Sequence, residues 1–173
     1  MTHTRGLVEA IVVGSTMLAV LASPFSRAAD ASEVRMTRVL QETPLSPAAD
    51  VPADVRKECT DLGDELPKAI VRANRSATLV ATPTALSEKT GRYLSVEITK
   101  VEAHGGGAFT GPKHMKVRGT LIENGKEIAD FEATRGAMAA AGSCTTLQKA
   151  EKDLGADIGV WLTNPKPHAH LGD

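Results

Sequence analysis

Two cysteines are the first candidates in this chain for covalent chemistry. They are its only cysteines, and they stand in similar phrases, CTDL at Cys59 and CTTL at Cys144. Two thiols are too few for a zinc site made of four thiolates, and the chain lacks the Cys-x-x-Cys spacing of a redox pair. In an oxidising compartment such a pair favours a disulfide. We therefore predict a structural bridge between Cys59 and Cys144.

A histidine and three glycines form the second candidate. The loop comprises His104, Gly105, Gly106, Gly107, Phe109, Gly111 and Lys113. In some esterases a His-Gly-Gly-Gly loop offers backbone N–H groups to an oxyanion, but the nucleophile is then a serine in a Gly-x-Ser-x-Gly turn. The sequence contains no such turn. We expect a binding loop without catalytic residues, and hydrolysis is the weakest of the alternatives.

Histidines raise the possibility of a metal site. His104 and His114 flank the glycine-rich loop, and Met115 next to His114 would suit a soft metal such as copper. His168 and His170 form a His-x-His pair near the end of the chain. Neither group has a third well-placed ligand, so we expect no metal or other cofactor. Periplasmic copper or zinc binding through His104, His114 and Met115 remains an alternative function.

The first 29 residues have the three-part pattern of a secretory signal peptide. Arg5 precedes an apolar run from Ala10 to Ala22, and Ser26-Arg27-Ala28 supplies small residues where a signal peptidase cleaves. The run is shorter than the roughly 20 residues that span a bilayer as a helix. We predict cleavage near Ala28 or Ala29 and a periplasmic or secreted product with no membrane span.

The rest of the chain divides into three parts. Residues 30–54 are expected to hold a short strand at 34–41 and a linker rich in proline and alanine. Residues 55–165 have the length and pattern of one folded domain. Residues 166–173 are expected to form a flexible tail.

Periodicity within the domain predicts its elements. Apolar spacing indicates a helix at 65–74, and alternation indicates strands at 77–82 and 92–102. A hairpin follows with Asn124-Gly125 at its turn, and a long helix begins near Ser143 and ends before Pro165. On this last helix the charged residues are expected mostly on the polar side: Lys149, Glu151, Lys152, Asp153 and Asp157. These elements predict an α+β two-layer sandwich, with an antiparallel sheet of about 4–5 strands and two helices on one face.

The second half of the domain resembles a known group of proteins. Its motifs are GGGAFTGPK at Gly105–Lys113 and the helix CTTL…DIGVWL that ends at Leu162. They are similar to those of a family of small exported proteobacterial proteins of unknown function, which carry a GGGA(W/F)(S/T)GPK loop and a helix with the pattern Cys-x-x-Leu…Asp-Ile-x-x-Trp-Leu. The resemblance implies secretion and a compact α+β domain. It brings no catalytic residues.

Composition and charge exclude some classes of function. The net charge is −1 and aromatic residues make up 3% of the chain, so no basic surface for nucleic acid is indicated. The carboxylates fall on expected solvent faces, which gives no acid/base pair for catalysis. We expect a non-enzymatic periplasmic domain that binds an envelope protein, another envelope component or a small ligand. The expected contact surfaces are the loop at 104–112 and the sheet face that bears Lys116 and Arg118.

Overall fold

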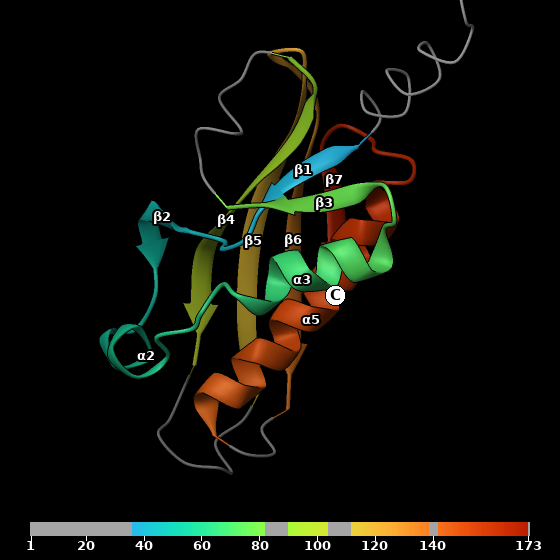
Figure 1. Cartoon of the computed structure of the whole chain (residues 1–173). Coiled ribbons are helices and arrows are strands. Elements are labelled where there is room, and N and C mark those ends of the chain that lie inside the picture. The colour runs from blue at the N-terminus through green and yellow to red at the C-terminus, as the bar shows by residue number, and fades with distance from the viewer. Residues whose placement is uncertain (1–35, 82–89, 104–111, 139–141, 173) are drawn as a thin grey trace, which may run out of the picture.

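A computed structural model describes residues 36–81, 90–103, 112–138 and 142–172 of the chain. In this structure a twisted sheet carries helices on one of its faces (Figure 1). Three helices belong to the described residues, α2 (Ala53–Glu58), α3 (Glu65–Ala73) and α5 (Ser143–Trp161). The strands are β1 (Thr37–Leu40), β2 (Leu45–Asp50), β3 (Ala77–Val80), β4 (Arg92–Glu102), β5 (Lys113–Glu123), β6 (Lys126–Ala137) and β7 (Ala169–Gly172).

Three long antiparallel strands, β4, β5 and β6, form the centre of the sheet. Their sequences alternate between apolar and polar residues, which suits a sheet with one covered face and one wet face. The predicted strand at 92–102 and the predicted hairpin are both confirmed. Asn124 and Gly125 have φ angles of 51° and 76°, so both central turn residues adopt the left-handed conformation that the Asn-Gly dipeptide favours.

Parallel strands extend the sheet on both sides of this centre. The strand order is β3-β1-β4-β5-β6-β7, and β2 pairs with β4 beyond the end of β1. β1 and β3 are parallel neighbours joined through α2 and α3, while β6 and β7 are parallel neighbours joined through α5. A parallel pair needs a crossover connection, commonly a helix, and these two crossovers place α3 and α5 side by side over one face (Figure 1).

The predicted fold class is therefore wrong in its sheet and in its helix count. The sheet has seven strands and is mixed, and three helices are present in the described residues. The expected linker before residue 55 holds β2 and the start of α2, and the expected flexible tail forms β7. These short elements have little apolar periodicity of their own. Pairing with β4 and β6 stabilises them as strands, and Pro47 is tolerated because β2 lies at an edge.

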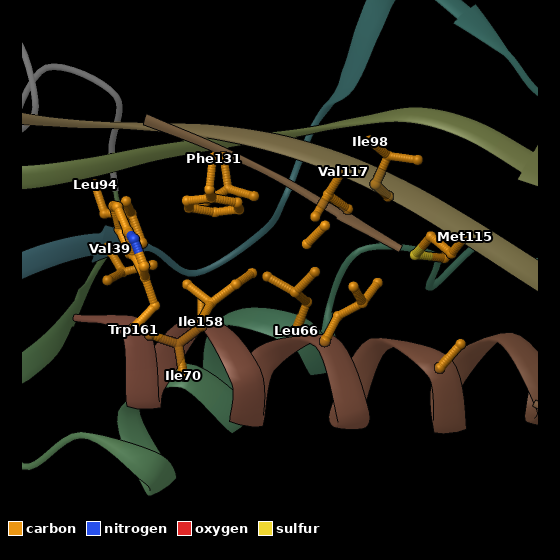
Figure 2. Packing of buried hydrophobic residues seen from close by; sticks show 14 of the residues in the cluster. Val39, Leu66, Ile70, Leu94, Ile98, Met115, Val117, Phe131, Ile158 and Trp161 are labelled. Carbon is orange, nitrogen blue, oxygen red and sulfur yellow. The ribbon is translucent and has the colours of Figure 1, made fainter. Parts of the chain in front are cut away.

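The core lies between the sheet and the helices α3 and α5. Figure 2 shows Phe131 of β6 and Ile158 of α5 facing one another across this layer. The rings of Phe131 and Trp161 meet edge to face with centroids 4.8 Å apart. Gly119 on β5 is the cross-strand partner of Phe131, and a side chain at Gly119 would collide with that ring. The glycine thus makes room for the largest apolar side chain of the sheet.

Helices α3 and α5 pack unusually closely because small residues line their contact. A Cβ at Gly155 would lie 2.5 Å from the Cβ of Ala69, and a Cβ at Gly159 would lie 2.5 Å from the Cβ of Ala73. The two pairs repeat every four residues on each helix, which is one face of each. Moving from Gly155 to Gly159 along α5 matches moving from Ala69 to Ala73 along α3, so the second half of α5 runs parallel to α3.

Two buried polar side chains join the same helices at the two ends of α3. The Glu151 carboxylate accepts hydrogen bonds from the backbone N–H groups of Gly63 and Glu65, at 3.0 and 2.9 Å. At the other end, the Asn74 Nδ2 donates to the carbonyl of Gly159 at 3.0 Å. The expected position of Glu151 on the polar side of its helix is wrong. The side chain is fully buried, because it caps α3 where the Asp64 side chain makes no capping hydrogen bond.

The predicted disulfide is present. Cys59 and Cys144 are bridged, with their Cα atoms 5.3 Å apart. Cys59 follows the last residue of α2, and Cys144 is the second residue of α5. The bridge therefore ties the segment that leads into α3 to the first turn of α5. Within the described ranges, no helix is long and apolar enough to cross a membrane.

Candidate functional site

The face of the sheet opposite α3 and α5 is the candidate site, and we call it the open face. Residues of β4, β5 and β6 alternate between the core and this face, and none of the helices in the described part of the chain packs on it. Most of its members are polar or charged: Ser95, Glu97, Thr99, Lys100, Glu102, His114, Lys116, Arg118, Thr120, Asp130, Glu132 and Thr134. Tyr93 and Ile122, which are cross-strand partners, lie on the same face near the hairpin turn.

A row of alternating charge crosses the middle of the open face. Glu97, Arg118 and Glu132 are direct cross-strand neighbours on β4, β5 and β6, and His170 of β7 is paired with Glu132. The Arg118 Nε donates a hydrogen bond to the Glu97 carboxylate. Both side chains remain partly accessible, so the pair contributes little to stability. The pair sets the guanidinium of Arg118 beside Glu97 on the surface of the sheet.

An irregularity in β4 adds two cations beside this row. The register of β4 against β5 shifts between Ile98 and Lys100, and Thr99 is the additional residue. A bulge of this kind re-aims the side chains that follow it. Strict alternation would turn Lys100 toward the core, but after the shift Val101 is buried and Lys100 lies opposite Lys116 on the open face.

The two lysines at the bulge differ in their partners. The Lys100 ammonium lies 2.6 Å from Glu102 and 3.9 Å from Asp50, and the hydrogen bond with Glu102 raises the pKa of Lys100. The Lys116 ammonium has no acidic partner within the residues that the structure describes. One cation of the pair is thus neutralised locally, and the other is left to solvent or to a ligand.

Shallow hollows lie around these cations. One of about 310 Å³ is lined by Thr99, Lys100, Lys116, Val117, Arg118, Glu132, Ala133 and Thr134. A second of about 120 Å³ adjoins it and is lined by Lys100, Glu102, His114, Lys116 and Thr134. Cations outnumber carboxylates in both, and the threonine hydroxyls can donate or accept. Such a surface suits a polar ligand that carries acidic groups.

The structure describes only the end of the predicted binding loop. His104, Gly105, Gly106, Gly107, Phe109 and Gly111 fall outside the described residues. Lys113, at the end of that loop, is the first residue of β5 and is fully buried. Of the sheet residues expected at the contact surface, Lys116 and Arg118 both lie on the open face. Sequence reasoning missed Lys100, because periodicity cannot reveal a bulge.

The candidate metal ligands are not brought together within the described residues. His114 lies on the open face, whereas Met115, the next residue along β5, is completely buried in the core. His168 is held by Asp130: its backbone N–H donates to one carboxylate oxygen, and its Nδ1 lies 3.1 Å from the other. This backbone hydrogen bond lowers the pKa of Asp130. In the described parts of the chain, no three histidine, cysteine or acidic side chains are grouped as metal ligands.

Comparisons with known proteins give only distant structural matches. No family model and no curated protein match the chain. A substituted form of the PelC dodecamer from Paraburkholderia phytofirmans is 15% identical over 70% of this chain and 86% of that chain, with a TM-score of 0.45. A minor lipoprotein from Acinetobacter baumannii is 18% identical over 78% of this chain and 96% of that chain, with a TM-score of 0.43. Likeness at this level carries no argument about function.

Proposed function

We propose that this chain is an exported, non-enzymatic binding domain that recognises an acidic segment of an envelope protein through the open face. The observation that carries the proposal is the cluster of Lys100, Lys116 and Arg118, brought together beside hydroxyl groups by the bulge at Thr99. Bulges are frequent where a sheet presents functional side chains.

The mixed charge of the open face favours a protein over a uniform polyanion. Glu97 and Glu132 flank Arg118, and Asp130 lies on the same face. A partner with only negative groups would be repelled by these carboxylates, while a protein segment can present acids to the lysines and a base or an amide to Glu132. Such patterned charge gives specificity and a fixed register more than raw affinity.

The rest of the fold supports a binding role, because it ties together the helices that cover the other face of the sheet. The disulfide joins the segment that leads into α3 to the start of α5, and Glu151 and Asn74 fix the two helices to one another. A preformed surface loses less conformational entropy on association than a mobile one. The bridge also suits an oxidising compartment, in agreement with the predicted signal peptide.

Photocross-linking in the producing cell tests this function. A photoreactive amino acid replaces Thr134, which lines both hollows but leaves the three cations in place. The matched control replaces Ala156, an exposed residue of α5 on the opposite side of the molecule. We expect a protease-sensitive adduct from position 134 and none from position 156.

Three results would count against the proposal. The same adduct from both positions would mean that the open face is not the binding surface. If the protein is present in the envelope but position 134 gives no adduct, then no partner protein binds at the open face. An adduct that resists protease would replace the proposed protein with a polysaccharide or lipid.

A further inference from the structure

A third hollow lies at the end of the core layer where α3 and α5 finish. It measures about 380 Å³ and is lined by Thr37 of β1, Asn74 and Ser76 after α3, Arg92 of β4, and Leu162 and Thr163 after α5. Thr37 and Arg92 are cross-strand partners, so the sheet forms one wall and the helix ends form the other. This hollow does not share a residue with the open face.

Arg92 is the distinctive residue of this hollow. Its Nε is buried and has no hydrogen-bond partner among the described residues, and none of the six lining residues is acidic. Arg92 also forms no ion pair within the described ranges. A buried donor without a partner costs free energy comparable to a lost hydrogen bond, so a site that retains one has a reason to do so.

The carbonyl groups of the helix ends do not supply the missing acceptor. The carbonyl of Ile158 accepts the N–H of Leu162, and the carbonyl of Trp161 accepts the N–H of Asn164. The carbonyl of Val160 accepts both the N–H and the hydroxyl of Thr163. These carbonyls take part in the interactions that end α5, and none of them is a partner of the Arg92 Nε.

We propose that this hollow binds a small organic anion, with Arg92 as its anchor. A guanidinium matches the two oxygens of a carboxylate or a phosphate with two parallel N–H donors. The hydroxyls of Ser76 and Thr37 line the same space and can donate to the remaining oxygens. The volume leaves room for an organic part beyond the anionic group.

Titration with simple anions tests this site. Inorganic phosphate and succinate are added separately to the purified full-length protein, and the backbone amide resonances of Ser76, Arg92 and Thr163 are followed by nuclear magnetic resonance. We expect saturable shifts at these residues with at least one probe, and the preferred probe assigns the ligand as a phosphate or a carboxylate. Arg92→Gln removes a charge-assisted contact, so the affinity should fall by about tenfold or more.

Two further variants make the test decisive. Lys57→Gln removes an equal charge from an exposed position on α2 and should leave the titration unchanged. Arg92→Lys keeps the positive charge but loses the two parallel N–H donors of the guanidinium, so it should bind with an intermediate affinity. An intermediate affinity would also show that the loss of binding in Arg92→Gln does not come from misfolding. Absence of saturable shifts with both probes, or equal shifts in Arg92→Gln and the unaltered protein, would overturn the proposal.

Discussion

The carboxylate of Glu151 accepts the backbone N–H of Gly63 at 3.0 Å, across 88 residues of sequence. The second oxygen of the same carboxylate accepts the N–H of Glu65. A side chain from the middle of α5 thus caps the N-terminus of α3, whose first N–H groups have no partners within their own helix. The start of α3 therefore depends on the position of α5.

Replacing Glu151 with alanine should destabilise the protein strongly. The substitution leaves two N–H groups without acceptors in a buried place, and the expected loss in the free energy of unfolding is about 2–4 kcal/mol. Urea denaturation followed by circular dichroism measures it. Glu132→Ala on the open face is the control and should change stability by no more than about 0.5 kcal/mol. Equal small effects of the two substitutions would show that the cap has no energetic role.

Stability should also depend on pH through Glu151. Burial raises the pKa of this carboxyl above the ordinary value of 4.5, although the N–H groups of Gly63, Glu65 and Leu66 oppose the shift. Between 4.5 and the raised pKa the native state binds more protons than the unfolded state, so the contribution of Glu151 to stability falls as the pH rises through this window. Below that window the contribution is fully present.

The variant Glu151→Gln isolates this effect. Urea denaturation at a series of pH values gives the free energy of unfolding for the variant and for the unaltered protein. The advantage of the unaltered protein should shrink as the pH rises above 4.5 and then level off. Other titrating carboxyls, such as Glu65 with a pKa lowered by Lys68, are present in both proteins and cancel in the difference. A difference that is constant or grows with pH would contradict the raised pKa.

Gly155→Ala tests the close packing of α3 and α5. The added methyl group would lie 2.5 Å from both the Cβ of Ala69 and the carbonyl oxygen of Leu66, so the helices must move apart. Although alanine is the better helix former, we expect a net loss of about 1–3 kcal/mol from overpacking. Thermal unfolding provides the measurement, and Ala156→Ser on the exposed side of α5 is the control. A stabilised Gly155→Ala variant would mean that the helices are not in contact there.

Removing the disulfide should cost more than any of these changes. Cys59 and Cys144 are 85 residues apart, and in the chain-entropy model a closed loop of that length contributes about 4.5 kcal/mol. The double variant Cys59→Ser, Cys144→Ser should therefore unfold at a markedly lower urea concentration. Thiol titration of the denatured, non-reduced protein should find no free thiol. Two thiols per chain in protein taken from the envelope would refute the bridge.

Sequence patterns identified the long elements because each has enough residues to show its period. The strand at 92–102, the turn at Asn124-Gly125 and the helix beginning at Ser143 all agree with the structure. Sequence patterns did not predict the parallel strands β2 and β7, because these segments become strands only by pairing with β4 and β6. The segment Ala169–Gly172 has no strand periodicity to detect, and it becomes a strand where it meets β6.

The candidate site could be predicted only in part from the sequence, because some of its residues depend on contacts between distant segments. Lys116 and Arg118 fall on the open face because β5 alternates regularly, which a pattern can show. The position of Lys100 depends on a one-residue register shift, and the burial of Glu151 depends on a helix more than 80 residues away. Neither is encoded in local periodicity. Arg92 reads in sequence as an ordinary first residue of a strand, and its hollow exists only where two helix ends meet the sheet.

The central claim is that the cations of the open face hold an acidic partner. The most direct measurement is the yield of the photocross-linked adduct from position 134 in the double variant Lys116→Glu, Arg118→Glu. Its control is Lys57→Glu, Lys149→Glu, which changes the net charge equally at exposed residues of the helices α2 and α5. We predict that the adduct is lost in the first variant and retained in the second. Equal yields in both variants would contradict the claim.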